Sequence, residues 1–178
     1  MKSNLLFFLL IIFLTILQAT FLPIIFPTSS TPNLLLMLII SSTLFFDFSV
    51  VLKWAIISGM IFDLLAYEKI GFSAIVFVFV AYLVSFFTRR FSIESRLGSF
   101  LIIIFLVIVT TFFYRFSIII FDYYPINILI ILKNINFFRN VFLEIIFNSI
   151  LFVPVFFLVK KSKINNANSM YDLAKLKR

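Results

Sequence analysis

Residues 58–84, SGMIFDLLAYEKIGFSAIVFVFVAYLV, hold two apolar segments separated by a short polar turn. Gly59 and Asp63 are four residues apart in the first segment, and the second segment begins with Gly71 and Ala74. Side chains three or four residues apart share one face of a helix, and small side chains on that face let two helices approach closely in lipid. We therefore predict a pair of helices packed through four small residues: Ala55, Gly59, Gly71 and Ala74.

The composition of the whole chain excludes most soluble functions. Of 178 residues, 63% are hydrophobic and 12% are charged, about half the charged fraction of roughly 25% in soluble domains. The chain has no His and no Cys, which removes disulfides, thiol catalysis and nearly all zinc and haem sites. We expect no enzymatic activity, no catalytic, cofactor-binding or metal-binding residues, and no nucleic-acid partner.

Six apolar runs are long enough to be read as transmembrane helices, because the bilayer core is about 30 Å thick and a helix rises 1.5 Å per residue. They are residues 4–22, 33–48, 50–66, 70–87, 97–121 and 140–159. The predicted fold is an all-α integral membrane protein, a six-transmembrane-helix bundle over residues 1–160. Residues 161–178 are expected to form a basic cytoplasmic tail. The apolar part of residues 123–138 is too short to span, so we expect this segment to lie on the outer face.

The basic residues indicate the orientation of these helices, since Lys and Arg accumulate on the cytoplasmic side. With a cytoplasmic N-terminus, eleven basic residues fall inside and three fall outside: Lys2, Lys53, Arg89, Arg90, Arg96, Lys160, Lys161, Lys163, Lys175, Lys177 and Arg178, against Lys69, Lys133 and Arg139. Arg115, within the fifth run, completes the fifteen. We therefore predict a multi-pass protein with both termini in the cytoplasm, in contact with membrane lipid.

Several polar residues fall inside the predicted spans, where ionisable groups are costly and need a reason. Counted from the ends of the runs, five of them lie at overlapping depth in the outer half of the membrane: Gln18, Asp63, Arg115, Glu144 and Asn148. We call these the outer polar cluster. An Arg115–Glu144 ion pair could hold two helices in register, or the cluster could belong to a partner or ligand surface. Asp63 and Glu144 could also reach the interface by snorkelling.

Three further features accompany the helix pair. Its pattern comprises Gly59, Asp63, Gly71, Ala74, Tyr82 and Leu83. The first helix ends in Leu17, Gln18 and Thr20, and the pair Pro32 and Asn33 opens the second. Together with chain length, helix number and the basic tail, this combination resembles the rod shape-determining protein MreD family over residues 15–87.

The resemblance implies a non-enzymatic membrane scaffold of the bacterial cell-elongation machinery, which acts in rod shape and peptidoglycan synthesis. It implies an MreC-like single-span partner, indirect contact with an actin-like protein and peptidoglycan synthases, and the bacterial cytoplasmic (inner) membrane. Such proteins also resemble substrate-binding subunits of energy-coupling-factor transporters. The alternative function is therefore a small-ligand-binding membrane subunit of a vitamin-type transporter. Its usual paired Ala contact on the first helix is reduced here to Ala19.

Overall fold

The structure, a computed structural model, describes residues 2–26, 30–66, 69–90, 96–123 and 135–176. Most of the segment expected on the outer face, residues 124–134, lies outside the described residues. Within the described ranges the secondary structure is helical and contains no strand. The fold is an all-α membrane protein, as predicted.

Six helical stretches make up the part of the chain that the structure describes. They are α1 (Lys2–Ile16), continued by the π turn η1 (Leu17–Phe21) and by α2 (Leu22–Ile25), then α3 (Leu34–Phe45), α4 (Phe48–Leu65), α5 (Phe72–Arg90), α6 (Arg96–Tyr123) and α8 (Ile135–Leu176). Each overlaps one of the predicted apolar runs. The largest difference is at the C-terminal end, where α8 continues through most of the stretch expected to be a tail.

Three of these helical stretches are both long enough and apolar enough to cross a membrane. Three stretches qualify: Phe7–Ile25, Phe48–Leu65 and Asn136–Ser162. The apolar parts of the other three helices are shorter: Leu34–Phe45, Phe72–Thr88 and Ile102–Ile118. At 1.5 Å per residue, the 12 residues of α3 rise only about 18 Å. Therefore α3 is better described as the interior of the bundle than as an independent span.

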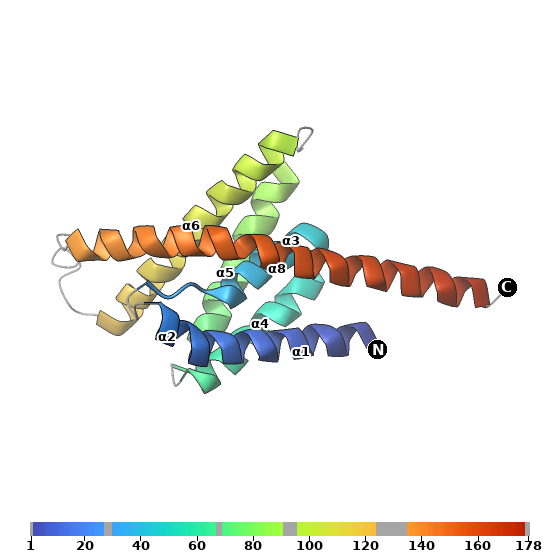
Figure 1. Cartoon of the computed structure of the whole chain (residues 1–178), viewed down its shortest axis with the longest axis horizontal. Helices are drawn as coiled ribbons and strands as arrows, with labels where there is room; N and C mark the ends of the chain where they lie inside the picture. Colours follow the sequence, from blue (N-terminus) through green and yellow to red (C-terminus); the bar gives the residue numbers. More distant parts are fainter. Residues whose placement is uncertain (1, 27–29, 67–68, 91–95, 124–134, 177–178) are drawn as a thin grey trace.

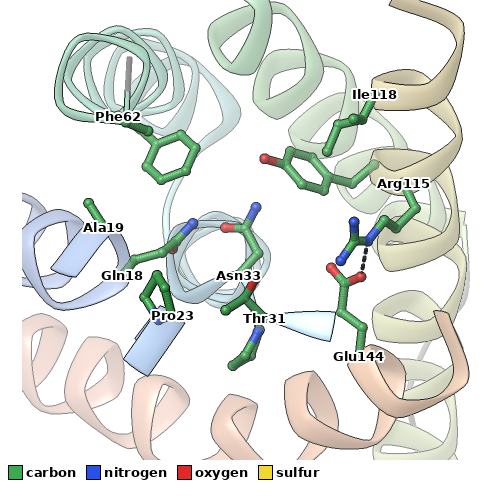
Figure 2. Close-up of a pocket in the computed structure, with 12 residues that line it drawn as sticks. Gln18, Ala19, Pro23, Thr31, Asn33, Phe62, Arg115, Ile118 and Glu144 are labelled. Carbon is green, nitrogen blue, oxygen red and sulfur yellow. Dashed lines mark hydrogen bonds and ion pairs between the residues drawn. The ribbon is translucent and has the colours of Figure 1, made fainter. Parts of the chain in front are cut away.

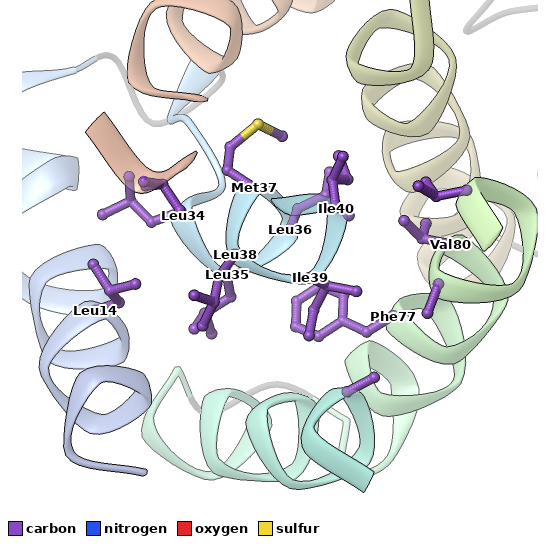
Figure 3. Close-up of a cluster of buried hydrophobic side chains, with 14 of the residues drawn as sticks. Leu14, Leu34, Leu35, Leu36, Met37, Leu38, Ile39, Ile40, Phe77 and Val80 are labelled. Atoms are coloured by element: carbon purple, nitrogen blue, oxygen red, sulfur yellow. The ribbon is translucent and has the colours of Figure 1, made fainter. Parts of the chain in front are cut away.

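The core of the protein surrounds α3. Every residue from Leu34 to Thr43 is buried, which is typical of a helix enclosed on all sides. Figure 3 looks along α3 and shows its side chains pointing outward in all directions toward the neighbouring helices. Those neighbours are α1, α4, α5, α6 and α8, and they bring Ile11, Phe77 and Val80 into the same cluster.

Successive helices alternate in direction, so that α1 and α8 run antiparallel and both ends of the chain lie on the same side of the bundle (Figure 1). The ends of α1, α4 and α6 and the starts of α3, α5 and α8 consequently meet at the opposite side. We call this opposite side the η1 end of the bundle. The connections there bring Gln18, Asn33 and Glu144 to one side of the bundle.

The helices α4 and α5 pack closely where Gly59 faces Ala74. A Cβ atom added to Gly59 would lie 2.3 Å from the Cα of Ala74, far inside van der Waals contact. Ala55 and Ala74 are also buried. Gly71 differs from its predicted role as a packing residue: it precedes α5, has a φ of +92°, and a Cβ there would meet nothing within 4 Å. Its function in the fold is the left-handed turn, which glycine adopts without steric cost.

Replacing Gly59 with Leu should impair accumulation and stability of the protein. The new side chain meets backbone rather than a movable side chain, so α4 and α5 must separate. Overpacking of this kind costs about 1–3 kcal/mol or more. The measurement is protein level in membranes together with the midpoint of thermal unfolding in detergent. Met60→Leu is the matched control, because Met60 is exposed on the same helix. Wild-type values for Gly59→Leu would contradict the close packing.

Candidate functional site

The start of α3 is a buried helix end whose backbone N–H groups bond to side chains. The first N–H groups of any helix have no partner within it. The Leu36 N–H donates to Asn33 Oδ1 (2.9 Å), and the Leu35 N–H donates to Gln18 Oε1 (3.0 Å). The N–H of Asn33 itself donates to Asn148 Oδ1 (2.8 Å). Three amide side chains, from η1, from the start of α3 and from α8, therefore close this helix end.

The positions of these amides follow from local structure. Asn33 lies directly before the apolar run of α3 in an extended conformation, the usual geometry of an N-cap residue. Gln18 lies in the π turn that precedes Pro23; proline disturbs the preceding helical turn because it lacks an N–H and its ring is bulky. Asn148 also donates from Nδ2 to Thr111 Oγ1 (3.0 Å). One side chain of α8 thus connects α3 with α6.

An ion pair joins α6 to α8 beside these amides. Arg115 Nε donates to Glu144 Oε2. The Glu144 side chain is 1% exposed, whereas that of Arg115 is 21% exposed. A carboxylate this deeply buried needs a counter-charge, because removing it from water is costly. The pair links α6 to α8, and such a contact is what the first of the sequence-based alternatives requires.

These groups surround a cavity of about 350 Å³ at the η1 end, which we call the cap cavity. Figure 2 shows the amide of Asn33 in its centre, with Gln18 on one side and the Arg115–Glu144 pair on the other. The wall consists of Gln18, Ala19, Pro23, Thr31, Pro32, Asn33, Phe62, Ala66, Tyr114, Arg115, Ile118 and Glu144. Its polar part contains two amides, a guanidinium, a carboxylate and two hydroxyls, so the wall holds both hydrogen-bond donors and acceptors.

Asp63 contacts a different helix start from the other members of the outer polar cluster. Its carboxylate accepts the Gly71 N–H (2.7 Å at Oδ2) and the Ser73 N–H (3.2 Å). It is 1% exposed and does not belong to the cavity wall. Asp63 therefore caps the start of α5 across the α4–α5 turn. A carboxylate is well placed there, because the N-terminus of a helix carries partial positive charge.

The structure thus divides the predicted residues into groups. Gln18, Arg115 and Glu144 line one cavity, and Asn148 bonds directly to Asn33 beside it. Sequence reasoning gave Asn33 no role at this site, although an Asn after Pro32 and before an apolar run is a recognisable capping signal. It also passed over Tyr114 and Thr111, buried polar residues that no local pattern distinguishes from other polar residues of an apolar helix.

Replacing Asn148 with Leu should destabilise the fold. The substitution leaves the Asn33 N–H and the Thr111 hydroxyl without Asn148, and an unsatisfied buried polar group costs about 1–3 kcal/mol. We expect a lower midpoint of thermal unfolding in detergent. Ile150→Leu is the control, since Ile150 lies on the exposed side of α8. An unchanged midpoint for Asn148→Leu would show that the α3 start does not depend on this bond.

The ion pair should show strong coupling between its two members. Arg115→Met leaves the buried Glu144 carboxylate without its counter-charge, and breaking a buried pair in this way costs about 3–5 kcal/mol. The double variant Arg115→Met/Glu144→Leu removes both charges, so it should be more stable than Arg115→Met alone. A double-mutant cycle by thermal or denaturant unfolding measures the coupling. Additive effects of the two substitutions would contradict a functioning ion pair.

Comparison with known proteins gives the family. A family model described as rod shape-determining protein MreD matches residues 1–162, which include the α4–α5 pair, all residues of the cap cavity and most of the described helices. No curated protein and no solved structure shows a significant match to the chain. Since the match extends over most of the sequence, the chain belongs to the MreD family of rod shape-determining proteins.

Proposed function

We propose that this protein is a non-enzymatic scaffold of the bacterial cell-elongation machinery, which holds an MreC-like single-span partner in the membrane. Through that partner it would reach an actin-like protein and the peptidoglycan synthases. The observation that carries the proposal is the family match over residues 1–162. The alternative, a small-ligand-binding subunit of a vitamin-type transporter, is less favoured because the matching family is one of shape determination.

The distribution of polar and apolar groups supports a binding rather than a catalytic role. At the η1 end, the side-chain oxygens of Gln18, Asp63 and Asn148 accept backbone N–H groups, and Arg115 pairs with Glu144. The outward sides of the helices are apolar. One such side of α1 carries exposed side chains at helical spacing: Leu5, Leu9, Phe13 and Ile16. A second runs along α8: Phe138, Phe142, Ile146, Ile150 and Phe157. A single membrane-spanning partner helix could pack along either side.

The proposal places the protein in the bacterial cytoplasmic membrane with both ends in the cytoplasm. Two observations support this orientation. The basic residues divide eleven to three in its favour under the positive-inside rule. The two ends of the chain also lie on one side of the bundle, as Figure 1 shows. In this orientation the η1 end and its cap cavity face the outer leaflet. A C-terminal reporter that is active only in the cytoplasm tests it directly, and an inactive reporter on expressed protein would overturn it.

Depletion of the protein in its rod-shaped host should make the cells wide or round. The comparison is with cells complemented by wild-type protein, followed by microscopy of cell width. Unchanged shape after complete depletion would contradict the proposal.

A biochemical test addresses the partner separately. The double variant Leu9→Ala/Phe13→Ala removes apolar contacts from the exposed side of α1. It should reduce co-purification of the single-span partner several-fold while leaving the unfolding midpoint near wild type, because side chains facing lipid contribute little to the core. The matched control is Phe142→Ala/Ile150→Ala on the exposed side of α8. If only the control loses the partner, α8 rather than α1 is the docking helix. If neither does, the proposed single-span interaction is wrong.

A further inference from the structure

Only one of the two polar atoms in the Asn33 side chain has a hydrogen-bond partner in the fold. Its Oδ1 accepts the Leu36 N–H, which fixes the orientation of the amide. Its Nδ2 is buried and has no hydrogen-bond partner. Four serine hydroxyls share that property among the described residues: Ser30, Ser41, Ser42 and Ser73. A hydroxyl can rotate toward a nearby carbonyl, whereas Asn33 Nδ2 cannot turn away without breaking the cap.

This unpartnered donor faces the cap cavity. Asn33 is 2% exposed, and Figure 2 shows its amide in the midst of the cavity-lining side chains. Gln18, on the same wall, uses Oε1 to accept the Leu35 N–H, and its Nε2 takes no part in that bond. Two amide nitrogens of the wall are therefore donors that the capping of α3 does not require. A ligand with acceptor oxygens would give Asn33 Nδ2 the partner that it lacks and could also accept a hydrogen bond from Gln18 Nε2.

The charged side chains in the wall restrict the chemical class of the ligand further. Arg115 and Glu144 lie side by side and form an ion pair, so the wall has a positive and a negative group but no net charge. Electrostatic complementarity favours a ligand with the same property, a phosphate on the donor side and a cation near the carboxylate. The volume of about 350 Å³ lies within the range of about 300–1,000 Å³ that is typical of small-molecule sites.

The helical turn that contributes Pro23 to the cavity wall is apolar on its exposed side, which favours a lipid as the ligand. Pro23 lines the cavity and belongs to α2. The neighbouring side chains Phe21, Ile24 and Ile25 are 60%, 83% and 69% exposed. Lys and Arg are absent from residues 23–32. Donors within the cavity and exposed hydrocarbon beside it together match an amphipathic molecule, with a polar headgroup inside and acyl chains along α2.

We propose that the cap cavity binds the zwitterionic phosphodiester headgroup of a membrane phospholipid. The phosphate accepts hydrogen bonds from Asn33 Nδ2, Gln18 Nε2 and the Arg115 guanidinium, and the ammonium group lies near Glu144. The acyl chains pack against Phe21, Ile24 and Ile25. This inference does not depend on the proposed scaffold function, because it rests on the cavity alone.

The test uses purified full-length protein in detergent, freed of lipid. Phosphatidylethanolamine, phosphatidylglycerol and water-soluble glycerophosphoethanolamine are titrated separately, and binding is followed by native mass spectrometry and by the rise in unfolding midpoint. We expect phosphatidylethanolamine to bind at least tenfold more tightly than the other two. Equal binding of phosphatidylglycerol would overturn the zwitterionic preference. Binding of glycerophosphoethanolamine alone would overturn the lipid as the source of the headgroup.

Asn33→Asp removes the Nδ2 donor and keeps the oxygen that caps α3. Aspartate keeps an acceptor for the Leu36 N–H and is a good N-cap, but it replaces the Nδ2 donor with an oxygen that repels phosphate. We expect at least a tenfold loss of phosphatidylethanolamine affinity. Because a carboxylate at this 2% exposed position also lowers stability, the affinity is measured below the unfolding midpoint of the variant, where the lipid-free protein is folded. Gln18→Glu applies the same change to the second donor, and it serves where Asn33→Asp does not fold. Ser85→Ala, in the wall of a second cavity near Phe45 and Phe156, is the control. Wild-type affinity in the folded Asn33→Asp or Gln18→Glu variants would overturn the proposal.

Discussion

The satisfaction of backbone N–H groups at the buried start of α3 is the constraint on which the other features of this protein depend. Neither lipid nor a packed interior supplies water to a helix end, so each N–H needs a protein partner. Gln18, Asn33 and Asn148 supply these partners from three elements. Because α3 is enclosed on all sides, these three bonds also fix where η1 and α8 stand around it. Capping here is a tertiary interaction that assembles the bundle.

The short length of α3 explains why polar groups collect at the η1 end. A helix of about 18 Å cannot reach across a core of about 30 Å, so its start lies below the surface, among longer helices. The space above that start is the cap cavity, and its wall is completed by Arg115 and Glu144 from α6 and α8. Close approach of α4 and α5 through Gly59 is a separate requirement, with Asp63 capping α5 in the same manner as Asn33 caps α3.

Sequence reasoning was sufficient for features that depend on local pattern. The apolar runs located the six helical stretches found among the described residues, and the small residues located the approach of Gly59 to Ala74. The family also followed from residues 58–84 and their neighbours.

Other features depend on which segments of the chain meet in the fold. The predicted depth of Asp63 in the membrane is similar to that of Arg115 and Glu144, so the sequence grouped the three residues. In the structure the α4–α5 turn brings Ser73 to Asp63, whose carboxylate accepts the Ser73 N–H. Gly71 was assigned to packing because spacing alone does not distinguish a helical glycine from one with positive φ. Hydropathy also could not predict that α3 is buried, because a lipid-facing helix and a helix enclosed by protein have similar hydropathy.

The choice of amides rather than carboxylates at the α3 start connects the fold with the cavity. For capping alone, an aspartate at position 33 would do as well as asparagine and would interact more favourably with the helix dipole. Asparagine instead buries an unpaired Nδ2, at a cost of about 1–3 kcal/mol. Gln18 likewise uses Oε1 to accept the Leu35 N–H, and its Nε2 takes no part in that bond. An acceptor bound in the cavity would offset a cost of this size. The side-chain oxygens of Asn33 and Gln18 accept N–H groups at the start of α3, and in our proposal their side-chain nitrogens donate to the ligand.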